Sequence, residues 1–533
     1  MFLKHLFSYI CVYCVYSFKT IKSTQIECDP ISNTDFGRRF CFIRHINDGI
    51  IQNVTFKPNP IADEKRELIF DNCTLHFLPL GIFTNFPNIK TLYGWNIKLK
   101  NLTKEVFRNS KELFVLDFSK NNIGVLDTNT FHLAKSLNQL DLSRNQIQII
   151  HTDAFTGLEQ LKMLNLDNNK LQLIPANCFK PLIQLQTIRL SHNLIKMIPT
   201  ELFEQNIYLH GIYLNDNAIE WLYGELTFRH LTRVNEFDLH NNPNANLGCC
   251  VINAQSIDIR NTNSIGCYIG SRTRRVVANN NHISYIDSYD AISTNLEYVD
   301  LANNQLQKIL NLTRFESLIH LDLMNNTMDD IGLNSFANMH RLEILNLQNS
   351  GLSKIYFGLF SHKSKLKILD ISYNNLGNID FQMFVSMTSL LKLHLDGNNL
   401  TKIDATELRK IFPALSKMSI SQNNWSCQHL ASIIKYLESN GIALDSIDST
   451  KNTENIKGIP CKSNDESQII ENPVSLKESD AEVSKQKSVL TNIPGGIAYD
   501  QKLRLLQLKY VIQNTIESAN EAGKKIENIL HIN

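Results

Sequence analysis

The sequence lacks the features that mark several common classes of protein. It carries no excess of charge of one sign, since 53 Lys and Arg face 52 Asp and Glu for a formal net charge of +1. Only 21 Gly and 13 Pro occur among 533 residues, which excludes collagen-like and proline-rich low-complexity chains. Beyond the N-terminal segment no stretch reaches the roughly 18 apolar residues of a membrane helix. We therefore expect neither charge-driven nucleic-acid binding nor membrane insertion.

Motifs of catalysis and of tight metal binding are also missing. The chain contains no His-Glu-x-x-His, no Gly-x-Ser-x-Gly and no glycine-rich phosphate loop, and outside the N-terminal pair Cys11 and Cys14 it has no Cys-x-x-Cys knuckle. Its 16 His are scattered, and His240, His320 and His394 fall on different repeats, too far apart to share an ion. The sequence predicts a protein without enzyme activity, cofactor or metal.

The N-terminus has the pattern of a secretory leader. Lys4 and His5 precede the uncharged run of residues 6–18, LFSYICVYCVYSF, which is too short to span a bilayer. A signal peptide over residues 1–23 would remove Cys11 and Cys14 and leave nine of the 11 cysteines. Secretion agrees with seven possible N-glycosylation sites, at Asn53, Asn72, Asn101, Asn311, Asn325, Asn399 and Asn424.

A leucine pattern that recurs at constant spacing dominates the rest of the chain. Aligned on L-x-x-L-x-L-x-x-N-x-L, the first leucine recurs at Leu113, Leu137, Leu161, Leu185 and Leu209, and again at Leu318, Leu342, Leu366 and Leu390. This spacing is the leucine-rich repeat signature. It predicts an α/β solenoid of about fifteen or sixteen repeats over residues 66–425, irregular at 243–275, with a parallel sheet on its concave face.

The pattern also predicts the core. Leucines at places one, four, six and eleven should point inward, and the asparagine at place nine should hydrogen-bond backbone groups of the bend. Phenylalanines on the convex side should close the core, namely Phe131, Phe155, Phe179, Phe203, Phe336, Phe360 and Phe384.

Cysteines gather where a solenoid needs caps. We expect an N-terminal cap over residues 24–65 with Cys28 paired to Cys41, and a C-terminal cap over 426–461 with Cys427 paired to Cys461. A helix should begin near Cys427. Either Cys249 or Cys250 can pair with Cys267. The remaining thiols, including Cys73 and Cys178, are either buried or supply one bond to another chain.

The C-terminal region changes character twice. Residues 462–499 are polar and are interpreted as a linker. Residues 500–533 regain helical periodicity, with an apolar seam at Leu505, Leu508, Ile512, Thr515, Ala519, Ala522, Ile526 and Ile529. This segment forms either a short coiled coil with a partner helix or a helix that folds back onto the solenoid.

The predicted concave face offers candidate contacts. Place five carries Asp117, Asp141, Asp238, Asp300, Asp322 and Asp370, and tyrosines occur at Tyr213, Tyr298 and Tyr373. A column of carboxylates would favour a basic partner. The alternative is that Leu-Asp-Leu is simply a frequent form of the repeat. A glycan on Asn325 would block part of this face.

The whole arrangement resembles the leucine-rich immune molecules of mosquitoes. The resemblance is carried by the leader, the regular repeats, the stretch from Cys249 to Ile283, the terminal Asn424-Trp-Ser-Cys427 helix and the heptad tail. It implies a disulfide-linked dimer with a homologous leucine-rich repeat chain that holds a thioester-containing complement-like protein. Because the tail after Cys461 has no cysteine, an interchain bond would have to come from Cys249, Cys250 or another repeat cysteine.

A second function of a different class fits the same features. An extracellular adhesion or ligand-binding decoy module would also be a secreted leucine-rich repeat protein, and it would have no immune effector as partner.

Overall fold

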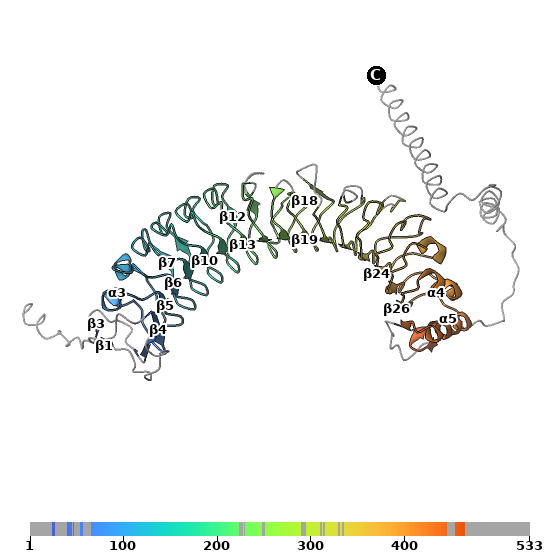
Figure 1. Ribbon diagram of the computed structural model, residues 1–533, viewed down its shortest axis with the longest axis horizontal. Coiled ribbons are helices and arrows are strands. Elements are labelled where there is room, and N and C mark those ends of the chain that lie inside the picture. The colour runs from blue at the N-terminus through green and yellow to red at the C-terminus, as the bar shows by residue number, and fades with distance from the viewer. Residues whose placement is uncertain are drawn as a thin grey trace, which may run out of the picture. The chain divides into compact units, whose positions relative to one another are not determined.

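A computed structural model describes the repeats and parts of both caps (Figure 1). The described residues are 24–26, 40–44, 46, 54–56, 66–222, 228, 230–247, 251–288, 295–309, 312, 315–328, 331–332, 335–444 and 454–463. The predicted leader, linker and coiled-coil seam lie outside them. The chain divides into two compact units, which we call unit 1 (Met1–Leu306) and unit 2 (Gln307–Asn533).

Unit 1 is built on a parallel sheet with one strand per repeat, lining the inner side of its curve in Figure 1. Its strands are β2 (Phe40–Arg44), β4 (Glu67–Asp71), β5 (Thr91–Tyr93), β6 (Val115–Asp117), β8 (Gln139–Asp141), β10 (Met163–Asn165), β11 (Thr187–Arg189), β13 (Gly211–Tyr213), β15 (Glu236–Asp238), β17 (Ser256–Asp258), β19 (Arg275–Val277) and β21 (Tyr298–Asp300).

Short elements lie outside the main sheet of unit 1. They include the pairs β1 (Thr24–Ile26) with β3 (Val54–Phe56), β7 (Val125–Leu126) with β9 (Ile149–Ile150), and β12 (Met197–Ile198) with β14 (Trp221–Leu222), together with the helical turns α3 (Ile82–Asn85) and η2 (Lys104–Phe107).

Unit 2 repeats the same plan and ends in a cap. Its parallel strands are β22 (His320–Asp322), β23 (Ile344–Asn346), β24 (Ile368–Asp370), β25 (Lys392–His394), β26 (Lys417–Ser419) and β27 (Ala443–Leu444). Its helices are η4 (Phe381–Phe384), η5 (Ala405–Glu407), α4 (Leu408–Ile411) and α5 (Cys427–Ser439), and β28 (Asn455–Ile456) pairs with β29 (Ile459–Pro460). The predicted leucine-rich repeat solenoid is therefore confirmed, with about 15 turns.

The repeat period sets the strand register. Leu140 of β8 lies opposite Leu164 of β10, the equivalent leucine of the next repeat, so equivalent side chains stack from coil to coil. Because side chains alternate across a strand, the place-four leucines point into the core and their neighbours point out. Leu140 and Leu164 are almost completely buried.

The predicted asparagine ladder is present. Asn169 Nδ2 donates to the carbonyl oxygens of Leu142 and Leu166, both at 3.0 Å, and its Oδ1 accepts from the backbone N–H of Ile147 at 3.0 Å. Each such side chain therefore bonds its own coil and the preceding one. Backbone groups that would be orphaned at the bend are satisfied inside the core.

The predicted phenylalanine column is also confirmed. In unit 1 the rings of Phe131, Phe155, Phe179 and Phe203 follow one another with centroids 5.9 to 6.2 Å apart. In unit 2 the same contact joins Phe336, Phe360 and Phe384. All seven rings are fully buried on the convex side.

The predicted irregularity turns out to be two shortened repeats. Phe237 lies opposite Ile257, and Ile257 lies opposite Val276, so each of these turns spans fewer residues than a regular repeat. They lack the convex phenylalanine and instead carry a small parallel sheet of β16 (Val251–Ile252), β18 (Gly266–Ile269) and β20 (Tyr285–Ser288). The strands of the main sheet continue through this region without a break in pairing.

The C-terminal cap forms as predicted. Cys427 and Cys461 are joined by a disulfide, and Ser426 caps α5 by accepting from the N–H of His429. The helix buries Leu430, Ile433, Ile434 and Leu437 over the last coil. In the N-terminal cap, β2 continues the main sheet and Cys41 is disulfide-bonded, while Cys28 lies outside the described residues.

The prediction that Cys267 forms a disulfide is wrong. Cys267 is a free thiol with a fully buried side chain on β18, and burial raises its pKa to about 12. Cys249 and Cys250 lie outside the described residues. The sequence pattern misled because the shortened repeat turns this side chain into the core, where a thiol packs as a small apolar group.

The other free thiols of the described residues are buried too. Cys73 takes place nine of its repeat, and its Sγ donates to the carbonyl oxygens of Ile43 and Asp71. Burial raises the pKa of Cys178 on the convex side. These two thiols are core groups, as Cys267 is, so all three are poorly placed to bond another chain. In the part of the chain that the structure describes, no helix is long and apolar enough to cross a membrane.

Candidate protein-binding surface

The candidate site is the outward face of the main sheet in unit 1. Side chains at places three, five and seven of each repeat stand on this face, which we call the sheet face. Successive strands place equivalent residues opposite one another, as with Tyr93, Asp117 and Asp141 on β5, β6 and β8. A sheet tied together by the ladder and the core presents these side chains from a rigid support.

The predicted column of carboxylates exists, and its first role is local. Asp117 Oδ1 accepts a hydrogen bond at 2.9 Å from the backbone N–H of Ser119, two positions later. The same bond to position i+2 is made by all the other predicted carboxylates, Asp141, Asp238, Asp300, Asp322 and Asp370. Each aspartate therefore holds the turn that follows its strand, as Asx turns do.

The carboxylate column is neither continuous nor fully exposed to a partner. Asn165 Nδ2 donates to Asp141 Oδ2 at 3.0 Å, and in unit 2 Asn346 Nδ2 donates to Asp322 Oδ2 at 3.1 Å. In unit 1, Arg189 and Tyr213 separate the first aspartates from the later ones. The acidic character is thus confined to short segments of the sheet face.

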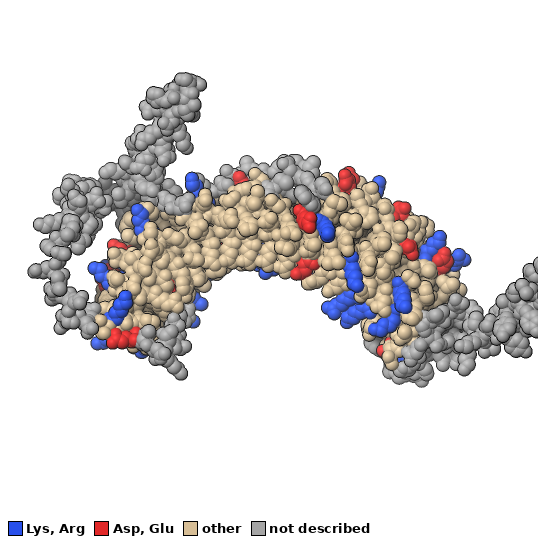
Figure 2. Space-filling view, turned by 180° about the vertical axis from the view of Figure 1, so that it is seen from behind, with Lys and Arg blue, Asp and Glu red and all other residues tan. Residues whose placement is uncertain are grey.

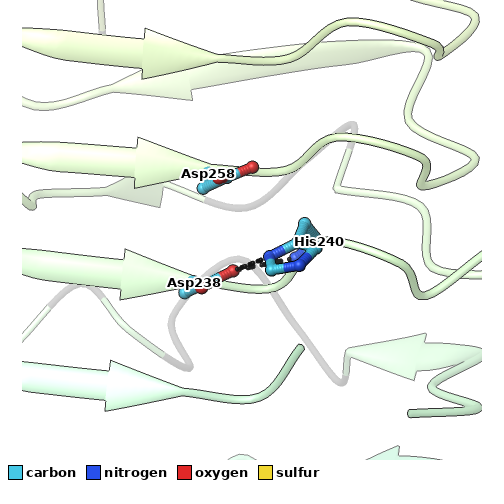
Figure 3. Close-up of side chains that lie close together, drawn as sticks. All are labelled: Asp238, His240 and Asp258. Atoms are coloured by element: carbon cyan, nitrogen blue, oxygen red, sulfur yellow. Dashed lines mark hydrogen bonds and ion pairs between the residues drawn. The ribbon is translucent and has the colours of Figure 1, made fainter. Parts of the chain in front are cut away.

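The densest segment lies on β15 and β17 (Figure 3). Asp238 and Asp258 stand opposite each other on adjacent strands, and His240 turns its Nδ1 to within 2.5 Å of Asp238 Oδ1. Arg260 holds Asp258 through both carboxylate oxygens, with Nε to Oδ1 at 2.9 Å and Nη2 to Oδ2 at 2.7 Å. Sequence reasoning missed Asp258 and Arg260.

Three of these side chains could in principle hold a metal ion. One ligand atom each from Asp238, His240 and Asp258 lie within 4.8 Å of one another. The guanidinium of Arg260 already neutralises Asp258, however, and would repel a cation at that position. Burial raises the pKa of Asp238, against the opposing effect of His240. The arrangement is better described as a polar network in which Asp238 contacts an imidazole and Asp258 pairs with a guanidinium.

The network extends to the neighbouring coil through Asp216. Its Oδ2 lies 3.6 Å from His192 Nδ1 and 3.8 Å from His240 Nε2. Burial works against ionisation of Asp216, but hydrogen bonds from Asn241 and Asn215 outweigh it and lower the pKa of this carboxyl. The polar side chains of this network orient one another, and this arrangement favours binding of a protein surface over chemistry on a substrate.

Aromatic side chains on the sheet face are paired with arginines. The Arg189 guanidinium lies 4.2 Å from the ring centroid of Tyr213, and that of Arg275 lies 3.9 Å from the ring of Tyr298. Burial and a hydrogen bond to Glu236 raise the pKa of Tyr213 to about 12. Both tyrosines therefore lie on the face that the sequence predicted.

Tyr373 is placed differently from the other two predicted tyrosines. It follows β24 in unit 2, with a backbone φ of 54°, and it is 45% exposed. Its ring lies over Gly397, where an added Cβ would meet the ring at 2.5 Å. Glycine at 397 is therefore required by this close approach.

Sequence reasoning missed an aromatic cluster at the N-terminal end of the sheet face. Tyr93 at place five and Trp95 at place seven meet edge to face, with centroids 5.5 Å apart. Two strands away, Arg44 lies over the ring of Phe42 and bonds Asp71 at 2.8 Å. The repeat register, applied to every residue type at places five and seven, is the signal that identifies Tyr93 and Trp95.

Basic residues border this cluster. Arg66, Lys90 and Lys111 line a hollow together with Glu67 and Glu112. Figure 2 shows Lys and Arg side chains in greater number than Asp and Glu over the first repeats of unit 1 on the visible face. Although the net charge is near zero, basic and acidic side chains are therefore unevenly distributed over the surface.

The predicted glycosylation sites are accessible where the structure describes them. Asn72, Asn101, Asn325, Asn399 and Asn424 are all exposed, whereas Asn53 and Asn311 lie outside the described residues. Asn325 also accepts a hydrogen bond from Asn349 at 2.8 Å on the loop after β22.

Comparison with known proteins supports the same fold. Residues 87–147, 135–195, 340–400 and 364–425 match the leucine rich repeat family. No curated protein sequence matches the chain. A leucine-rich repeat solenoid is typically non-enzymatic.

Several solved structures share the architecture. The LRIM1/APL1C complex superposes with a TM-score of 0.56 at 18% identity, over 95% of this chain and 81% of that one. The APL1 leucine-rich repeat domain gives 0.55 at 18% identity, over 83% and 100%. The Drosophila Toll–Spatzle complex gives 0.51 at 21% identity, over 77% and 55%. At these identities the likeness establishes the fold.

Proposed function

We propose that this leucine-rich repeat solenoid is a secreted, non-enzymatic protein of insect immunity that binds and stabilises a complement-like thioester protein. The observation that carries the binding role is the sheet face of unit 1. Arginine, tyrosine and tryptophan side chains stand there on a rigid support, and these residue types are enriched where proteins bind one another.

Three further features support the finer parts of the proposal. The leader sequence and the exposed glycosylation sites agree with secretion. The resemblance to the mosquito leucine-rich immune molecules suggests the thioester partner. Two of the structural neighbours, LRIM1/APL1C and Toll–Spatzle, are themselves complexes between proteins, which agrees with a protein ligand.

We propose in addition that the seam of residues 500–533 pairs this chain with a homologous leucine-rich repeat chain. Apolar residues at alternating spacings of three and four form the contact of two-stranded coiled coils. Because a single helix of this length is marginal in water, a partner helix would stabilise it.

Capture from insect haemolymph tests the function. The tagged full chain should retain a thioester-containing protein, identified by mass spectrometry, and should elute from size exclusion at the mass of a dimer. Replacing Leu505, Leu508 and Ile512 with serine should abolish the dimer because the seam loses its apolar contact.

The matched control replaces Gln507, Lys509 and Gln513, which lie off the seam, with serine. This control should leave the dimer intact. Recovery of adhesion receptors without any thioester protein would instead support the decoy or adhesion function.

A further inference from the structure

Beneath the Tyr93–Trp95 pair, the core residues at place six differ from the usual leucine in two successive repeats. Place six, a leucine in most repeats, is Gly94 here, and the next repeat has Phe118 at that place. A Cβ on Gly94 would lie 2.8 Å from the Phe118 ring, so the larger ring fills the space that the glycine leaves. The two aromatic rings on either side of Gly94 are held on the outer surface.

This pair differs from the other aromatic rings of the sheet face. Phe42, Tyr213 and Tyr298 each have an arginine of the same chain over the ring, at 4.9, 4.2 and 3.9 Å from the centroid. Over Tyr93 and Trp95, no Lys or Arg of the described residues is found in that position. Trp95 remains 39% exposed.

Carboxylates flank the open rings. Asp117 lies directly opposite Tyr93 on β6, and on β4, on the other side, Glu67 lies opposite Thr91, two residues before Tyr93. Burial, followed by the charges of Glu67 and Asp117, raises the pKa of Tyr93. The carboxylates of Glu67 and Asp117 therefore both act on the Tyr93 hydroxyl. Two π faces beside two carboxylates form an environment that attracts a cation.

We propose that Tyr93 and Trp95, with Glu67 and Asp117, receive an arginine or lysine side chain of the protein partner. The proposal rests on the protein-binding function above and names the chemistry of one contact. The same chain provides the precedent, because Arg44 lies over Phe42 while bonding Asp71. A partner's guanidinium would make the equivalent stack and ion pair here.

The basic residues nearby could favour a different partner group at this surface. Arg66, Lys90 and Lys111 around the adjacent hollow would attract an acidic segment instead. The Tyr93 ring discriminates between the two, because its face attracts cations and its neighbouring carboxylates repel anions.

A matched pair of peptides tests the contact by titration calorimetry on the full chain. The probe is a short arginine-rich peptide, and the control is the same peptide with citrulline, which keeps the shape and loses the charge. The arginine peptide should bind at least about tenfold more tightly, the scale of cation–π and ion-pair contacts together.

Three variants of the protein localise that difference. Trp95→Leu keeps an apolar side chain and removes the π face, and Glu67→Gln removes one charge at constant size. Each should weaken binding of the arginine peptide by about five- to tenfold. Phe357→Ala, at an exposed ring in unit 2, should leave it unchanged.

Equal binding of the arginine and citrulline peptides would overturn the proposal, as would unchanged binding to Trp95→Leu. Binding of a glutamate-rich peptide in place of the arginine peptide, lost in Lys90→Gln, would overturn it in favour of an acidic partner. If the chain captures a thioester protein from haemolymph and Trp95→Leu retains the same amount, the protein-binding function stands and this contact is refuted.

Discussion

Replacing Lys363 with methionine should raise the free energy of unfolding by about 3 kcal/mol at neutral pH. Lys363 is only 1% exposed on the convex side of unit 2, at the place where the flanking repeats bury Met339 and Met387. Its Nζ reaches the carbonyl oxygens of Ala337 and Ser361 at 3.5 and 3.3 Å. A charged ammonium in this position loses its hydration, and no carboxylate within the described part of the chain forms an ion pair with it.

The sign of the pH dependence follows from the same burial. Burial lowers the pKa of Lys363 from 10.5 to about 8, which corresponds to about 3 kcal/mol lost while the group is protonated in both states. Between pH 8 and 10.5 the unfolded chain holds the proton and the folded chain releases it. Stability contributed by this group therefore rises with pH, and the advantage of Lys363→Met shrinks over that window.

Urea unfolding of the full chain at pH 7 and pH 10 measures both effects. Lys365→Met, two positions away and exposed, is the matched control and should change stability by less than about 0.5 kcal/mol. A Lys363→Met variant that is no more stable than the parent at pH 7 would show that the ammonium is hydrated in the folded state.

Replacing Phe155 with alanine should lower the free energy of unfolding by about 3 to 5 kcal/mol. The ring is fully buried and contacts Phe131 and Phe179, with centroids 6.2 and 5.9 Å away. Removing it opens a cavity and breaks the phenylalanine column at one coil. Because each repeat is stabilised by its neighbours, the loss should spread to adjacent turns.

Hydrogen exchange of the full chain locates that loss. Amides of β8, β10 and β11 should exchange faster in Phe155→Ala, while unit 2 should be unaffected. Phe114→Ala removes a half-exposed ring of the same type and should have little effect. A loss below about 1 kcal/mol for Phe155→Ala would mean that the coils collapse around the missing ring.

The periodic parts of the structure could be predicted from the sequence because one coil determines the next. Leu140 and Leu164, the Asn169 ladder bonds and the phenylalanine column all follow from a single alignment of the repeats. The C-terminal helix and the Cys427–Cys461 disulfide were predictable because a solenoid end must cover its core.

The structure differs from what the sequence predicts where a repeat is shortened, or where a side chain hydrogen-bonds the backbone of the turn that follows it. Two shortened repeats turn Cys267 into the core, which the cysteine spacing did not reveal. The sequence predicts Asp117 as a contact for a partner, but one of its oxygens holds the following turn. The stacking of Arg189 on Tyr213 depends on the register between strands of successive repeats.

The aromatic contact at Tyr93 and Trp95 is implicit in the repeat register, because both residues occupy outward-facing places of their repeat. What the sequence alone could not show is that no arginine of the described residues lies over these rings. That depends on which side chains the neighbouring strands present, and therefore on the folded sheet.

The most direct test of the account is hydrogen exchange of the chain with and without the protein that it captures from haemolymph. If the sheet face of unit 1 is the binding surface, added protection should centre on β4, β5 and β6 and extend toward β15 and β17. Amides of the convex pair β7 and β9 should be unchanged. Protection confined to the convex side, with β5 and β6 unaffected, would contradict the central claim.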